Sequence, residues 1–140
     1  MYEMLILSHG ALASGYYQTM KMILGEEPNL TYCALEEGES SEELEHKLAS
    51  IIDWGSGSPL LVMADIYSGS PCRTAIMHLF KAKKECYLIA GINLPLVMEA
   101  YMQRNSDLQT VLDHLVETAK DNVINVNERL LKVKENSEDE

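Results

Sequence analysis

Short apolar runs alternate along the chain with longer segments in which apolar residues recur at helical spacing. The runs are rich in β-branched and long side chains, as in buried strands, and the longer segments have the pattern of amphipathic helices. The alternation predicts strands over 3–8, 30–35, 60–65 and 86–90. It predicts helices over 11–24, from Ser40 to the turn at 55–59, over 71–82, over 96–104 and from Asp107 onward.

Polar residues mark the start of two of these helices. Ser40 followed by Glu43 is a capping-box pattern, and Ser106 is a suitable cap for the helix that begins at Asp107. Beyond Lys120 two interpretations stay open, because the apolar residues there recur at helical spacing while 122–127 is also rich in Asn and β-branched residues.

Short strands separated by helices require right-handed crossovers and a parallel sheet. The predicted fold is therefore α/β and doubly wound, with a mostly parallel sheet in the flavodoxin-like order 2-1-3-4 and helices on both faces. A length of 140 residues fits one domain. We expect this domain to span 1–134 and the acidic tail 135–140 to be disordered, since its composition cannot support a core.

Charge and composition narrow the class of protein. The net charge of −11, much of it in 36–45 and in the tail, predicts repulsion of nucleic acid and attraction of basic protein surfaces. The apolar runs are shorter than the ~18 residues of a membrane span, and the N-terminus lacks a signal-peptide pattern, so we expect a cytoplasmic protein. Three cysteines without C-x-x-C spacing argue against a disulfide framework and a structural zinc site.

The candidate chemistry lies where the first and third strands end. In a sheet of the predicted order these strands are neighbours, and ligands bind beyond their carboxyl ends. His9 and Asp65 occupy those ends, and adjacent strands lie only ~4.8 Å apart. A carboxylate that accepts a hydrogen bond from one ring nitrogen selects the tautomer and directs the other nitrogen outward as a nucleophile. The spacing therefore predicts a histidine oriented by an aspartate.

Glycines and serines beside this pair predict an anion site. Gly10 precedes the first helix and Ser68, Gly69 and Ser70 precede the third, so backbone N–H groups at two helix ends should converge near His9. Ser70 adds a hydroxyl donor. Such donors offset the charge of a phosphoryl group, about −2, without a metal or other cofactor.

Three other functional classes compete with a phosphohistidine. A receiver domain also carries an Asp after its third strand, but it needs further carboxylates after the first strand, where this chain has Ser8 and His9. A small hydrolase could use Cys72 or Ser70 with His9 and Asp65. A non-catalytic module that binds a flavin or a nucleotide is the third.

The same residues make the chain resemble the enzyme IIA component of the mannose family of the bacterial phosphoenolpyruvate:sugar phosphotransferase system (PTS). The similarity covers nearly the whole domain, with 8-SHG-10, 22-MILGEE-27, 62-VMADIYSGSP-71 and 90-AGINLPLVMEA-100 in order and at the expected spacing. The family usually shows two glycines before Ser-Pro, whereas this chain has Ser68-Gly69, and it has Ile66-Tyr67 where a small polar residue and tryptophan are common.

The resemblance implies a phosphoryl carrier. His9 would accept the phosphoryl group from the phosphocarrier protein HPr and pass it to a sugar-specific IIB protein, with Asp65 orienting the ring. Ser70 and backbone donors at Gly10 and around 66–69 would hold the phosphate. The closest alternative within the family is the phosphotransfer subunit of dihydroxyacetone kinase, which shares the fold and the phosphohistidine.

The resemblance also carries expectations about assembly. Family members are homodimers in which a C-terminal strand can cross to the partner subunit, a use for the region after Lys120. The chain would be a separate IIA polypeptide in the cytoplasm, peripheral to the membrane through the IIC and IID components of the transporter.

Overall fold

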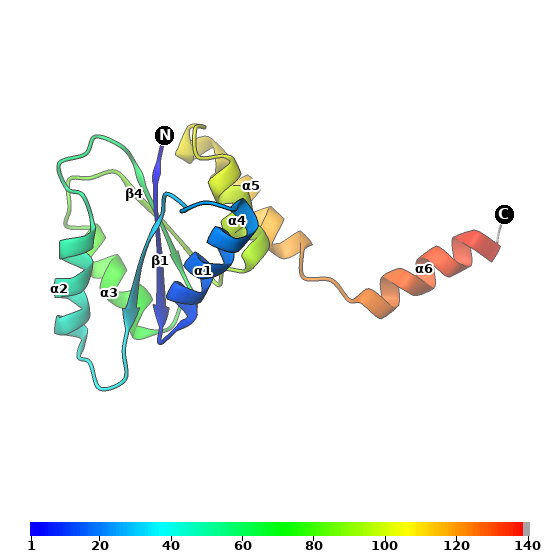
Figure 1. Cartoon of the computed structure of the whole chain (residues 1–140), viewed down its shortest axis with the longest axis horizontal. Coiled ribbons are helices and arrows are strands. Elements are labelled where there is room, and N and C mark those ends of the chain that lie inside the picture. The colour runs from blue at the N-terminus through cyan, green and yellow to red at the C-terminus, as the bar shows by residue number, and fades with distance from the viewer. Residues whose placement is uncertain (139–140) are drawn as a thin grey trace.

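The computed structural model describes residues 1–138 and confirms the predicted α/β class. Four parallel strands form one sheet in the order β2-β1-β3-β4, and helices cover both of its faces (Figure 1). The strands are β1 (Glu3–His9), β2 (Thr31–Leu35), β3 (Leu60–Ala64) and β4 (Cys86–Ala90). The helices are α1 (Leu12–Leu24), α2 (Ser41–Ile51), α3 (Ser70–Leu79), α4 (Leu94–Met102), α5 (Leu108–Asp121) and α6 (Val126–Glu138).

The two central strands divide the core into two layers. Every residue of β3 is buried, as is expected of a parallel strand covered on both faces. Met4 and Ile6 of β1 contribute to the cluster that packs under α1, α4 and α5, whereas Leu5 and Leu7 contribute to the cluster under α2 and α3. This alternation fixes the register, since a shift by one residue would exchange the two sets.

The predicted helix starts are correct for α2 and shifted for α4 and α5. Ser40 caps α2, and its hydroxyl accepts a hydrogen bond from the N–H of Glu43 at 3.2 Å. Helix α4 starts two residues before the predicted 96, because the side chain of Asn93 caps it. The N-cap of α5 is Asp107, and the predicted cap Ser106 instead donates to the side chain of Gln103.

Of the two interpretations for the region after Lys120, the structure has the helix: Val126–Glu138 form α6, and no C-terminal strand is present among residues 1–138. Helix α6 extends away from the body of the molecule (Figure 1), and all of its described residues are exposed. A helix satisfies its own backbone hydrogen bonds, whereas a strand needs a neighbouring edge. The tail expected to be disordered is helical to Glu138, and its last two residues lie outside the described part of the chain.

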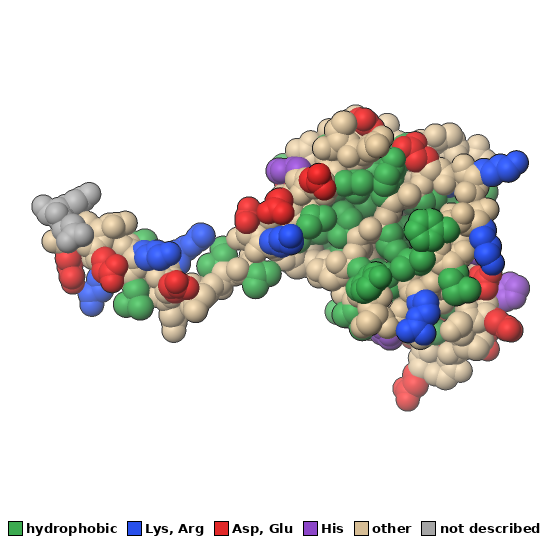
Figure 2. Space-filling model, turned by 180° about the vertical axis from the view of Figure 1, so that it is seen from behind, with side chains coloured by type: hydrophobic (Ala, Val, Ile, Leu, Met, Phe, Trp, Pro, Cys, Tyr) green, Lys and Arg blue, Asp and Glu red, His purple; other side chains and the backbone are tan. Residues whose placement is uncertain are grey.

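The edge of the sheet formed by β4 is open. Among residues 1–138, no strand pairs with the outer side of β4. This edge lines a hollow of about 680 Å³. Seen from behind, the molecule has hydrophobic side chains gathered on this face (Figure 2). We call this hollow the β4 groove; its lining residues include Tyr67, Ile76, Phe80, Tyr87 and Leu88.

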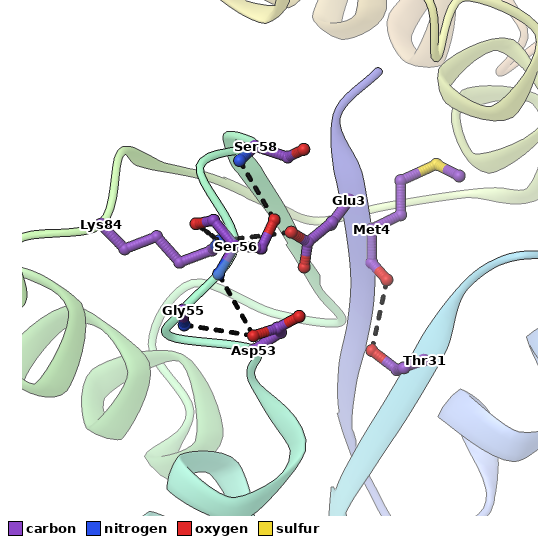
Figure 3. A network of polar contacts seen from close by, with 8 residues as sticks. All are labelled: Glu3, Met4, Thr31, Asp53, Gly55, Ser56, Ser58 and Lys84. Carbon is purple, nitrogen blue, oxygen red and sulfur yellow. Dashed lines mark hydrogen bonds and ion pairs between the residues drawn. The ribbon is translucent and has the colours of Figure 1, made fainter.

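A buried lysine connects the ends of the strands that lie far from the candidate site (Figure 3). The side chain of Lys84 is only 3% exposed, and its ammonium group donates to Glu3 Oε1 at 3.3 Å and to the carbonyl oxygen of Ser56 at 3.0 Å. These contacts join β1 to the loops that precede β3 and β4. Within the described residues, no helix is long and apolar enough to cross a membrane.

Candidate active site

His9 and Asp65 meet where β1 and β3 end. His9 is the last residue of β1, and Asp65 directly follows β3. Ring nitrogen Nδ1 of His9 lies 2.9 Å from Asp65 Oδ2, and the same oxygen accepts the backbone N–H of His9, also at 2.9 Å. The His9 side chain is 43% exposed and that of Asp65 is 10% exposed. The carboxylate is thus sheltered while the ring reaches the surface.

The hydrogen bonds of Asp65 keep it ionised. Burial alone would raise the pKa of this carboxyl, but hydrogen bonds from the His9 backbone, the His9 ring and the N–H of Ile66 outweigh burial and lower the pKa below its usual value. An ionised acceptor at Nδ1 places the ring proton there. Nitrogen Nε2 is then left with a free lone pair.

Gly69 brings the start of α3 against the His9 ring. A β-carbon built at Gly69 would lie 2.5 Å from Cε1 and 3.1 Å from Nε2 of that ring. Gly69 is the N-cap of α3, and Ser70 is the first residue of the helix. Because first-turn N–H groups of a helix have no acceptor inside it, the positive end of α3 lies beside Nε2.

The expected donors at Gly10 and Ile66 are already occupied, which corrects the prediction for these two residues. The N–H of Gly10 donates to the carbonyl oxygen of Leu35 at 2.9 Å, and the N–H of Ile66 donates to Asp65 Oδ1 at 2.9 Å. Gly10 instead serves the turn from β1 into α1, where its φ of +55° is a conformation that glycine adopts readily. The remaining donors for an anion are those around Ser68 to Ser70.

Ser8 is a feature of the site that the sequence analysis missed. Its side chain is buried, and its hydroxyl oxygen accepts the N–H of Ala13 at 2.8 Å. The hydroxyl group also donates to the carbonyl oxygen of Gly10 at 3.3 Å. The signal that could have located this role is a Ser placed shortly before a helix whose own N-cap position, Ala11, has no side-chain acceptor.

Cys72 is unsuited to act as a nucleophile. It is fully buried in the first turn of α3, and burial, together with the nearby charge of Asp65, raises the pKa of its thiol. The reactive form of cysteine is the thiolate, which a raised pKa disfavours. Among residues 1–138, no three His, Cys, Asp or Glu side chains are grouped as a metal site requires.

Two other histidines have acidic neighbours that the sequence did not reveal. His114 Nε2 lies 3.0 Å from Glu99 Oε1, and His78 Nδ1 lies 3.5 Å from Glu45 Oε1. Both pairs join neighbouring helices and lie apart from the strand ends that hold His9. They contribute to packing between helices.

The whole domain is similar to known phosphotransferase components. The model of the EIIA-man family, described as the PTS system fructose IIA component, matches residues 3–126. The sorbose-specific EIIA component of Lacticaseibacillus casei is 25% identical over 129 residues, covering 91% of this chain and 93% of that protein. The mannose-specific EIIAB component of Escherichia coli K12 is 29% identical over 119 residues, but the chain spans only 36% of its length.

Solved structures show the same architecture. The PTS IIA protein associated with the fucose utilization operon of Streptococcus pneumoniae matches with a TM-score of 0.81 and 28% identity, covering 92% of this chain and 96% of that one. The mannose/sorbose specific IIA subunit of Enterococcus faecalis has a TM-score of 0.79 at 24% identity, covering 88% and 92%.

Proposed function

The chain belongs to the mannose family of IIA components of the phosphotransferase system, which supports a phosphotransfer role in sugar uptake, and we propose that it carries the phosphoryl group on His9. The observation that carries this proposal is the hydrogen bond of 2.9 Å between Asp65 and Nδ1 of an exposed ring. The donor would be phosphorylated HPr and the acceptor a IIB protein.

The transfer is a substitution at phosphorus. The lone pair on His9 Nε2 attacks the phosphoryl group of phosphohistidine on HPr, so an Nε2–P bond forms while the N–P bond of the donor breaks and its electron pair returns to the donor ring. The proton on His9 Nδ1 stays in place. Positive charge that develops on the ring is stabilised by Asp65, and the reverse steps deliver the group to IIB.

The start of α3 would hold the phosphoryl oxygens. We propose that N–H groups around Ser68 to Ser70 and the Ser70 hydroxyl face the phosphoryl group on Nε2, which the close approach of Gly69 to the ring supports. Donors held in place by a helix need little reorganisation when charge arrives. This arrangement would offset a charge of about −2 on a protein that is already strongly acidic.

Mass measurement tests the carrier role. Purified protein is incubated with phosphoenolpyruvate, enzyme I and HPr, and the expected result is the gain of one phosphoryl group that is labile in acid and stable in alkali. His9→Gln should gain none. His46→Gln, a change at an exposed position of α2, should label like wild type. No gain by wild type, or labelling of the His9 variant, would contradict the proposal.

The acceptor separates the two phosphotransfer roles. We propose IIB of a sugar transporter, because the relatives compared above are PTS components. The phosphorylated protein should lose its label to a IIB protein and keep it when mixed with the kinase subunits of a dihydroxyacetone kinase. A small hydrolase would turn over an ester without HPr, a role that the buried Cys72 does not favour.

We also propose a cytoplasmic location beside the IIC and IID membrane components.

We further propose a homodimer in which the segment after Asn122 covers the β4 groove of the partner subunit. The segment projects from the body and exposes apolar side chains, while β4 has an open edge within the described residues. Light scattering should give the mass of two chains. Val126→Asp combined with Leu130→Asp should shift it toward one chain, whereas Asn127→Asp should not. A monomeric wild type would contradict this assembly.

A further inference from the structure

Ser8 is buried at the end of β1, with a side chain that reaches to the first turn of α1. It is 1% exposed, and its hydroxyl oxygen accepts the N–H of Ala13 at 2.8 Å while the hydroxyl group donates to the carbonyl oxygen of Gly10 at 3.3 Å. A buried hydroxyl must find such partners, because leaving it without them costs free energy. Both of its bonds close the turn that contains His9.

We infer that Ser8 is a positioning residue for phosphoryl transfer, acting on His9 through this turn. The inference rests on the proposed carrier role. Ser8 touches neither the reacting nitrogen nor the expected phosphoryl site. It holds the turn through its hydrogen bonds to Gly10 and Ala13. Asp65 holds the same turn at His9, because one of its oxygens accepts both the backbone N–H and the Nδ1–H of that residue.

The position of the His9 ring depends on the conformation of this turn. One carboxylate oxygen accepts both hydrogen bonds of His9, at 2.9 Å each, so a rotation of the His9 backbone changes both at once. Gly69 also lies against the ring, where a β-carbon would come within 2.5 Å of Cε1. In addition, Ala11 at the N-cap of α1 has no side-chain acceptor, and the Ser8 hydroxyl connects the first turn of the helix to the strand.

The test compares two serines whose hydroxyl oxygens accept a backbone N–H at the start of a helix. Ser8→Ala removes the bonds at the β1–α1 turn, and Ser40→Ala removes an equivalent bond, from Glu43 N–H, at the start of α2. Two readouts are needed: the rate of phosphoryl uptake from phosphorylated HPr, and the ¹⁵N chemical shifts of the His9 ring in the unphosphorylated protein. The second readout does not depend on the carrier role, so failure of that role and failure of this inference are distinguishable.

For Ser8→Ala we expect a fall in the uptake rate of about 10- to 100-fold, as a small misplacement of a reacting group can produce. We also expect ring shifts that indicate a mixture of tautomers. Ser40→Ala should lower the melting temperature by less, because Ser40 is exposed, and should leave both readouts at wild-type values. Ser8→Cys, which keeps the size and weakens the hydrogen bonds, should give an intermediate rate if the alanine variant fails to fold. Wild-type rate and ring shifts in the Ser8 variants, or equal losses in the Ser40 variant, would overturn the inference.

Discussion

Gly69 packs directly against the ring of His9, with room for a hydrogen but not for a methyl group. A β-carbon at position 69 would lie 2.5 Å from Cε1 of the ring and 3.1 Å from the side chain of Ile66. Real β-carbons do not approach other atoms so closely. The loop before α3 can therefore reach the nucleophile only because residue 69 has no side chain.

We predict that Gly69→Ala displaces the His9 ring and lowers the rate of phosphoryl uptake by at least about 10-fold. The added methyl group must move either the ring, which breaks its hydrogen bond to Asp65, or the loop that supplies the donors. Stopped-flow transfer from labelled HPr measures the rate. Gly57→Ala is the matched control, since a β-carbon at Gly57 meets nothing within 4 Å. Equal rates for the two variants would show that the contact has no role.

Asp65→Asn should lower the uptake rate by about 100-fold or more, in the range seen when a preorganised electrostatic partner is removed. The amide has nearly the same shape as the carboxylate but carries no charge to stabilise a positive ring. It can also present its NH₂ group to Nδ1, which would move the ring proton to Nε2 and block attack. Transfer kinetics measure the first effect, and ¹⁵N shifts of the His9 ring measure the second. A wild-type rate for Asp65→Asn would contradict the assigned role.

The same substitution predicts a difference in acid stability. The pKa of Asp65 is lower in the folded protein than its usual value of 3.8, so its ionised form is favoured by folding. That stabilisation is fully present above pH 3.8 and is lost as the pH falls through the folded pKa. The difference in melting temperature between wild type and Asp65→Asn should therefore shrink below about pH 4. A constant difference down to pH 2.5 would be inconsistent with a lowered pKa.

The sequence predicts the sheet and the meeting of His9 with Asp65 because both depend on strong, local signals. Each strand is a short apolar run bounded by turn residues, and Leu60–Ala64 is apolar throughout. Once the order β2-β1-β3-β4 follows from the crossovers, residues at the ends of β1 and β3 must be neighbours.

The finer parts of the site could not be predicted, because they depend on loop conformation. The turn at Gly10 directs its N–H to Leu35 on the neighbouring strand, so a donor expected for phosphate is used by the sheet. The closeness of Gly69 to the ring depends on the path of residues 66–69, which have no periodic pattern. The form of the segment after Asn122 depends on what covers its apolar side chains, which the sequence of one chain does not specify.

The raised pKa of Tyr2 predicts how the stability of the fold changes at alkaline pH. Its hydroxyl donates to the carbonyl oxygen of Ala100, and burial, with a smaller effect from the charge of Glu99, raises its pKa from 10.0 to about 12. Folding therefore favours the protonated form, and the resulting stabilisation is present below pH 10 and lost as the pH rises toward 12. Tyr2→Phe should destabilise the protein by about 1 kcal/mol at neutral pH.

Unfolding in urea at several pH values tests this expectation. The difference in free energy of unfolding between wild type and Tyr2→Phe should shrink between pH 10 and 12. Tyr67→Phe is the control, because Tyr67 is 75% exposed. A difference that stays constant would mean that Tyr2 ionises at its ordinary pKa, and one that grows with pH would mean that folding lowers its pKa; either result would contradict the prediction.

Lys84 allows stability to be separated from phosphotransfer. Its ammonium group is nearly buried and bonds to Glu3 and to the Ser56 carbonyl oxygen at the end of the sheet opposite to His9 (Figure 3). Lys84→Ala removes the cation and leaves Glu3 without its partner, so the free energy of unfolding should fall by about 1–3 kcal/mol. Lys84→Met should cost less, because it keeps the apolar stem that packs there.

Both Lys84 variants should take up phosphate at the wild-type rate at temperatures well below their melting transitions, because β1 and β3 keep their register at the other end. Urea unfolding gives the stability, and transfer from labelled HPr gives the rate on the same preparations. Lys83→Ala, at the exposed neighbouring position, should alter neither quantity. A fall in the transfer rate of the folded Lys84 variants would show that strain at one end of the sheet reaches the His9–Asp65 pair at the other.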